Sequence, residues 1–190
     1  MLIDIQRLTA LRHIAPKSDV RYYLNGVHVQ YNSEKDADNL TFTATDGNML
    51  GRFTDTALDD SGEKYSGESF ELIVPLETLA AIKVGARHPG TAILTGTGDD
   101  WVITDGNTSH RFTPIDGKFP NADIVIPTGE PSNEPAPFNF ELLANFTKVS
   151  KAMRVPRPGC FQIEYNGMAS ARVTHYKLPD FIGVVMPFRA

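Results

Sequence analysis

The sequence is poor in cysteine and has no long apolar run. Cys160 is the single cysteine, so no disulfide can form within the chain, and we expect a reducing compartment, the cytoplasm. No apolar stretch approaches the roughly 20 residues that a membrane-spanning helix needs. The segment Met1–Asp4 has no basic region followed by an apolar core, so we expect neither secretion nor a membrane partner.

Motifs of enzymes and of metal sites are also missing. There is no Gly-rich phosphate loop, no Gly-x-Ser-x-Gly elbow, and no Cys or His pair at metal-ligand spacing. The histidines are scattered singly, and the acidic pairs Asp59-Asp60 and Asp99-Asp100 fit solvated turns better than a calcium loop. We therefore expect a protein that is not an enzyme and uses no metal or cofactor. A small hydrolase built on Asp and His is the least favoured hypothesis.

The net charge of −5 argues against a protein that coats nucleic acid with its whole surface. Basic residues nevertheless recur on or just beyond three predicted helices: Arg7 and Arg12, Lys83 and Arg87, and Lys148, Lys151 and Arg154. One explanation is that helices commonly carry cations on their solvated faces. The sharper hypothesis is that the three helices present one basic surface to DNA phosphates, which require charge rather than base-reading side chains.

Apolar periodicity predicts an α+β chain. Spacings of three to four residues predict helices at about 4–15, 76–86 and 139–154. Alternation with period two, or a short apolar run, predicts strands at 27–31, 40–45, 70–74, 91–94, 101–103, 110–112, 124–127, 161–165, 168–176 and 181–188. The polar stretch 55–67 is predicted to be a loop.

Turn residues divide these elements into units. Asp46-Gly47 predicts a turn, and Asn166-Gly167 predicts a type I′ hairpin, because Gly accepts a positive φ. The order strand, helix, strands occurs three times, although no residue-level repeat accompanies it. Segment 128–137 contains three prolines, two acids and a glycine, which predicts a linker.

Three segments resemble the bacterial DNA polymerase III beta sliding clamp family. Arg21–Gly26, followed by Ala44–Gly47, resembles part of the middle domain of those clamps, and Ile115–Pro120, running to Val125–Pro127, resembles the segment that closes it. Val184–Arg189 resembles their C-terminal strand. The matches occur in family order. The resemblance implies a DNA-clamp fold of three strand–helix–strand units, with helices lining one face and sheets outside.

The resemblance also implies a domain plan. Residues 1–127 match a complete clamp-like domain of two units, 128–137 a linker, and 138–190 half of a last domain. The first domain of the family has no counterpart here, a trimming that suits a phage protein.

Two functional surfaces follow from the resemblance. The basic residues named above are expected to face double-stranded DNA. A cleft is expected to bind peptides of DNA polymerase and other clamp-binding-motif proteins, through Leu24, Thr45, Gly47, Asn48, Met49, Leu50, Pro127, Val184, Met186, Pro187, Phe188 and Arg189. Alternatively, these apolar groups only seal a core between domains. Asn48-Met49 replaces the usual His-Arg of the family, and Phe188 a usual methionine, so the preference for partner motifs is expected to differ.

The family's rings present twelve helices, and this chain offers three. The resemblance therefore implies a homotetramer that encircles DNA as a processivity factor, with a clamp loader as a further partner. The alternative is a module that forms no ring and sequesters clamp-binding peptides.

Overall fold

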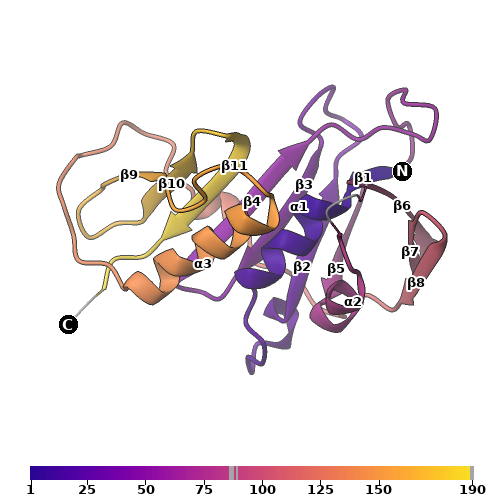
Figure 1. Ribbon diagram of the computed structural model, residues 1–190, viewed down its shortest axis with the longest axis horizontal. Helices are drawn as coiled ribbons and strands as arrows, with labels where there is room; N and C mark the ends of the chain where they lie inside the picture. Colours follow the sequence, from indigo (N-terminus) through magenta and orange to yellow (C-terminus); the bar gives the residue numbers. More distant parts are fainter. Residues whose placement is uncertain (86–87, 89, 189–190) are drawn as a thin grey trace.

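The computed structural model describes residues 1–85, 88 and 90–188. Two antiparallel sheets make up the protein, with α1 and α3 side by side against one face of the larger sheet (Figure 1). The smaller sheet lies at the opposite end of the molecule from strands β9–β11 (Figure 1). This α+β arrangement confirms the predicted fold class.

The larger sheet has seven strands in the order β5-β2-β3-β4-β11-β10-β9. Their bounds are Gly26–Tyr31 for β2, Leu40–Thr45 for β3, Met49–Asp55 for β4, Phe70–Pro75 for β5, Phe161–Glu164 for β9, Ala171–His175 for β10 and Leu178–Val185 for β11. The central pairing joins β4 to β11, with Leu50 opposite Val184. One sheet therefore spans both predicted clamp-like segments, and their division into a complete domain and a half domain stays a prediction.

The smaller sheet has the order β1-β6-β7-β8. Its strands are Leu2–Asp4 (β1), Thr91–Thr97 (β6), Asp100–Asp105 (β7) and Thr108–Phe112 (β8). Its inward side chains, such as Ile103 and Trp101, join the same hydrophobic core as the larger sheet. The two sheets are therefore held together by one continuous apolar interior.

The helices are α1 (Ile5–Ala10), α2 (Leu76–Ala81) and α3 (Phe140–Ala152), and a 3₁₀ turn, Leu11–His13, continues α1. Asp4 begins α1, because its carboxylate accepts hydrogen bonds from the backbone N–H of Gln6 and Arg7. The apolar stripe of α3 packs on β11, where Gly183 makes room: a Cβ there would lie 2.7 Å from Phe146 Cε1. Small residues in the sheet thus let helices approach it closely.

Several predicted boundaries are wrong. The second helix ends at Ala81 rather than at residue 86, because the backbone of Ile82 is extended and its side chain is buried in the core. Val84-Gly85 then disfavours a further helical turn. The first helix becomes 3₁₀ after Ala10. Segment 124–127 is not a strand. It begins inside a 3₁₀ turn, Ala122–Ile124, in which the Asp123 N–H donates a hydrogen bond to the Asn121 side chain.

The C-terminal strands also differ from the prediction. β9 ends at Glu164 and β10 begins at Ala171, so Asn166-Gly167 lies in a longer loop instead of a two-residue hairpin. The last strand is 178–185 rather than 181–188. The sequence analysis missed β1, which has three residues, and β4, whose alternation is interrupted by Gly51 and Arg52.

Candidate functional site

An apolar cavity of about 210 Å³ lies on the larger sheet where β4 and β11 meet the turns beside them. We call it the cleft. It brings together eight of the residues expected there, namely Leu24, Thr45, Gly47, Asn48, Met49, Leu50, Val184 and Met186. The wall opposite the strands is the 3₁₀ turn Ala122–Ile124 and its neighbours. The cleft therefore combines segments from both ends of the chain.

The turn between β3 and β4 is rigidly bonded. Asp46 Oδ1 accepts hydrogen bonds from the backbone N–H of Asn48 at 2.7 Å and of Met49 at 2.8 Å. Thr45 Oγ1 donates to Met49 O at 2.7 Å and accepts from Gly47 N at 3.1 Å. Gly47 has φ of 92°, a conformation that side chains disfavour. The rim of the cleft is thereby fixed before any partner arrives.

Arg21 reinforces this turn. Its Nη2 donates to Asp46 O at 3.0 Å, while Nε and Nη2 also bond the Asp19 carboxylate. These bonds from Arg21 lower the pKa of Asp19 to about 2. A Cβ on Gly47 would lie 2.9 Å from Arg21 Nη1, so the absence of a side chain at Gly47 leaves room for the guanidinium.

A shallow hollow of about 450 Å³ lies on the other side of the larger sheet, over α1, α3 and the end of α2. Its cations are Arg12, Lys148, Lys151 and Arg154, and we call it the basic hollow. His13 lies among them, and its pKa is lowered by burial first, then by the charges of Arg12 and Lys148. Cations from the 3₁₀ turn after α1 and from α3 and its end, far apart in sequence, therefore share one surface.

These cations bond neutral groups instead of carboxylates. Lys148 Nζ donates to Asn145 Oδ1 at 2.8 Å, and Arg12 Nη1 donates to Leu79 O at 3.4 Å. Arg154 Nη2 donates to the carbonyl oxygens of Val84 and Gly85, the first at 2.8 Å. Within residues 1–85, 88 and 90–188, none of the four cations of the hollow forms an ion pair. Their charge stays available to an external anion.

The fold is closely similar to solved bacterial clamps. The DNA polymerase sliding clamp from Pseudomonas aeruginosa matches with a TM-score of 0.70 and 20% identity over 100% of this chain and 66% of that one. The Bacillus subtilis clamp matches with a TM-score of 0.71 and 14% identity, over 100% of this chain and 64% of that one. The C. crescentus clamp matches with a TM-score of 0.71 and 18% identity, over 100% of this chain and 65% of that one. This chain has the sliding-clamp fold. No family model and no curated protein matches it.

The chain thus spans slightly less than two thirds of the length of these clamps. The resemblance to the sliding clamp family is confirmed at the level of fold. Among the described residues, no helix of this clamp fold is long and apolar enough to cross a bilayer, and no group of three or more His, Cys, Asp or Glu side chains could hold a metal ion.

Three of the described residues predicted for the cleft, Pro127, Pro187 and Phe188, do not line it. Pro127 lies beside the β9–β10 loop, where its carbonyl oxygen accepts a hydrogen bond from Arg172 Nη2. Pro187 is buried, and Phe188 is 56% exposed with its N–H bonded to Pro137 O at 2.8 Å. Arg189 lies outside the described residues.

The sequence analysis also missed cleft residues. The additional lining residues are Arg21, Tyr23, Pro120, Asn121, Ala122 and Val125. All of them lie in or next to the segments that carry the resemblance to clamps, so that signal could have found them. The wrong strand assignment at 124–127 hid the 3₁₀ turn that brings Ala122 to the cleft.

The basic residues divide in a way that the sequence did not indicate. Arg7 does not belong to the basic hollow, because its guanidinium pairs with Asp4 at 3.2 Å, Asp55 at 3.1 Å and Asp180 at 2.9 Å. Lys83 follows α2 on an exposed loop and does not line the hollow. Arg87 lies outside the described residues.

Proposed function

We propose that this protein is a DNA sliding clamp, a polymerase processivity factor that encircles duplex DNA as a homo-oligomeric ring in the cytoplasm. One observation carries the proposal: the basic hollow and the cleft lie on opposite faces of one sheet. Side chains alternate along a strand. Gly51 faces Leu11 of the 3₁₀ turn after α1 and Gly183 faces Phe146 of α3, so Leu50 and Val184, next to these glycines in sequence, face the cleft. A protein bound in the cleft would therefore not compete with DNA.

The helical face suits sequence-independent contact with duplex DNA. Arg12 in the 3₁₀ turn after α1 and the basic side chains of α3 and its end supply charge without aromatic platforms or base-reading groups. The net charge of −5 would keep the remaining surface from binding DNA. Sliding requires this kind of diffuse attraction, which does not depend on base sequence.

The cleft suits a short apolar segment of a partner. Leu24, Leu50 and Val184 present apolar surface, and Met186 is flexible enough to fit different side chains. The partners we propose are DNA polymerase and other proteins with clamp-binding motifs, with a clamp loader using the same cleft. The proposed role involves no catalysed reaction.

Ring closure would use the free strand edges. β8 ends the smaller sheet and β9 ends the larger one, and unpaired edges favour association with another chain. Three helices a chain make a homotetramer the proposed assembly. Light scattering at micromolar concentration is expected to give the mass of four chains, and a strict monomer would contradict the ring.

Retention on circular DNA tests the function. The protein should stay on a nicked circle in the presence of a loader and leave when the circle is cut. Lys148→Glu with Lys151→Glu should abolish retention, because two repulsive charges enter the basic hollow. The control protein carries Lys35→Glu and Lys177→Glu, so it has the same net charge as the first variant, but the changes lie at exposed positions outside the hollow. It should stay on the circle as the wild type does.

A second candidate is a module that sequesters clamp-binding peptides without forming a ring. It is favoured by the completeness of the cleft within a single chain. This module would be monomeric, and the Lys148 and Lys151 substitutions would leave its peptide binding and its cellular effect unchanged.

A further inference from the structure

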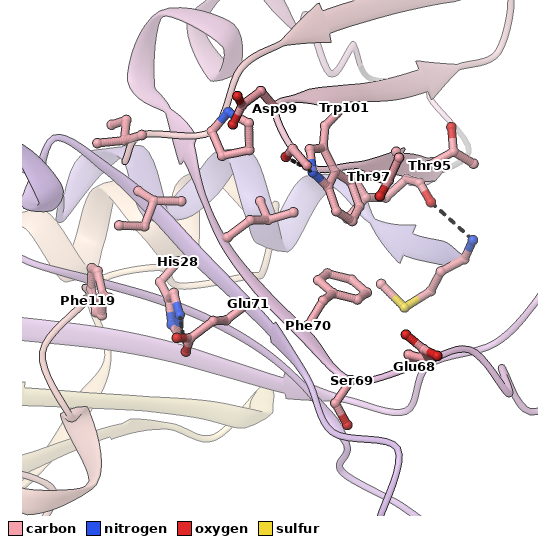
Figure 2. A pocket seen from close by; sticks show the side chains of 18 of the residues that line it. His28, Glu68, Ser69, Phe70, Glu71, Thr95, Thr97, Asp99, Trp101 and Phe119 are labelled. Atoms are coloured by element: carbon pink, nitrogen blue, oxygen red, sulfur yellow. Dashed lines mark hydrogen bonds and ion pairs between the residues drawn. The ribbon is translucent and has the colours of Figure 1, made fainter. Parts of the chain in front are cut away.

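A larger cavity, of about 860 Å³, lies between β5 and β6 and shares no lining residue with the cleft. We call it the edge groove. One wall is segment 68–73, which includes most of β5, and another is segment 94–98 of β6 and the turn after it (Figure 2). Its volume falls within the range of about 300–1,000 Å³ that ligand sites occupy.

The backbone of β5 is open on the side of the groove. β5 is an end strand and pairs only with β2. In an antiparallel pair, alternate residues direct their N–H and C=O away from the partner strand. Ile73 O accepts a hydrogen bond from Ile115 N at 3.0 Å, so the backbone N–H and C=O of Ile73 point away from β2. The backbone groups of Glu71, two positions earlier, have the same orientation. Among the described residues, no backbone group pairs with Glu71 on this side.

β6 is open in the same way. β1 pairs with β6 only at Thr91–Ile93, and Leu94 then exchanges two bonds with Met1, from Leu94 N to Met1 O at 2.9 Å and from Met1 N to Leu94 O at 3.1 Å. The backbone N–H and C=O of Gly96 point to the same side as those of Leu94. In the part of the chain that the structure describes, its N–H and C=O have no backbone partner there. Unpaired backbone groups thus face the groove from two strands.

The groove is aromatic inside and acidic around its opening. The Phe70 and Trp101 rings lie 5.1 Å apart, and the Trp101 indole N–H is already bonded to Gly98 O at 3.0 Å. The lining carboxylates are Glu68, Glu71, Asp99 and Asp116, against the Met1 amino group and His28 as the only basic lining groups among the described residues (Figure 2). An occupant with apolar and cationic side chains would complement this lining.

His28 places a weakly paired polar atom in the groove. It is buried, its ring stacks on Phe119 with centroids 4.7 Å apart, and its Nε2 has no hydrogen bond of good geometry. Glu71 Oε2 lies 3.4 Å from this nitrogen (Figure 2). A buried ring nitrogen whose one polar contact has poor geometry costs free energy, which a polar group of an occupant would recover.

We propose that the edge groove accepts an extended basic segment of a partner protein as an additional strand on β5. The backbone of that segment would pair with the N–H and C=O of Glu71 and with the N–H of Ile73, whose carbonyl oxygen is already bonded to Ile115 N. Because Phe70 and Leu72 face one side of β5 and Glu71 and Ile73 the other, the segment would alternate apolar and Lys or Arg side chains. This site is separate from the clamp function and would hold a second partner while the cleft is occupied.

Peptide binding to the full chain tests the proposal. The probe is a fluorescein-labelled peptide, Lys-Val-Lys-Val-Lys-Val-Lys, and its counterpart has Glu in place of each Lys. In fluorescence anisotropy the Lys peptide should bind at least about tenfold more tightly than the Glu peptide and should weaken with added salt. Amide hydrogen exchange should slow at Glu71 and Ile73 when the Lys peptide is added.

Variants at one position separate charge from backbone pairing. Glu71→Gln removes only the charge and should weaken binding about two- to fivefold. Glu71→Pro also removes the outward N–H and should weaken it about tenfold or more, while end strands tolerate Pro at such a position. Glu63→Gln, an exposed carboxylate outside the groove, is the matched control and should bind as the wild type does.

Equal binding of the Lys and Glu peptides would overturn the proposal. So would wild-type affinity in Glu71→Pro, or loss of binding in Asn48→Lys, since Asn48 is exposed and lines the cleft but not the edge groove. If Glu71→Pro lowers the melting temperature, the Glu71→Gln affinity and the amide exchange decide. DNA retention is measured separately, so failure here leaves the proposed clamp function standing.

Discussion

The backbone N–H of Met186 donates a hydrogen bond of 2.8 Å to the carbonyl oxygen of Asn48. This bond extends the β4–β11 pairing one step beyond its last pair, Met49 opposite Val185. It ties the turn after β3 to the segment after β11, so two walls of the cleft hold each other in place.

Replacing Met186 by Pro should weaken binding of a polymerase clamp-binding peptide. The loss of one backbone bond costs about 1 kcal/mol, or roughly fivefold in Kd. Met186→Leu keeps the N–H and a similar volume, and should change Kd less than twofold. Anisotropy with the labelled peptide measures both. Identical affinities of the two variants would show that the bond does not shape the cleft.

Gly183→Ala should destabilise the fold by about 1–3 kcal/mol, because its Cβ would lie 2.7 Å from Phe146 Cε1 and force α3 away from β11. Urea unfolding measures the loss. Gly159→Ala is the control, since the nearest atom to its Cβ would be Thr147 Oγ1 at 3.9 Å. A Gly183→Ala protein as stable as the control would mean that α3 does not rest tightly on the sheet.

Arg7→Met should reduce stability without weakening DNA retention. Arg7 is 19% exposed in its side chain and neutralises Asp4, Asp55 and Asp180, so its removal leaves three carboxylates facing one another. We expect a loss of about 1–3 kcal/mol in the free energy of unfolding. Lys151→Met should have the opposite effects. It should weaken DNA retention and keep the free energy of unfolding within about 0.5 kcal/mol of the wild type. Loss of retention in a folded Arg7→Met protein would contradict this division.

His13 should make stability fall as the pH decreases. Burial, then Arg12 and Lys148, hold the pKa of His13 below its ordinary value of 6.5 in the folded state, so the folded state disfavours the proton. The contribution of His13 to the free energy of unfolding is complete above pH 6.5 and is lost as the pH falls from 6.5 towards the lowered pKa. Urea unfolding between pH 7.5 and 5.5 should show the wild type losing stability relative to His13→Gln. His28, whose pKa is also lowered, is present in both proteins. A constant difference across this range would contradict the assignment.

Most of the local structure follows from the sequence because it depends on neighbouring residues. The alternation of β2 and β3, the apolar stripe of α3 and the Asp46-Gly47 turn are encoded within a few positions and occur as predicted. Boundaries failed where distant residues decide them. Ile82 adopts an extended backbone and enters the core, and segment 124–127 begins in a 3₁₀ turn that packs on β4 and β11 instead of forming a strand.

By itself, the sequence determined the strand and helix periods, the turn residues and the segments that resemble clamps. Only the tertiary structure decided which cations share a surface, because Arg7 is neutralised by carboxylates from three separate segments while Arg12 and Lys148 are not. It also decided that the cleft and the basic hollow lie on opposite faces. That outcome depends on the pairing register of β4 with β11, where a shift of one residue would exchange the two faces.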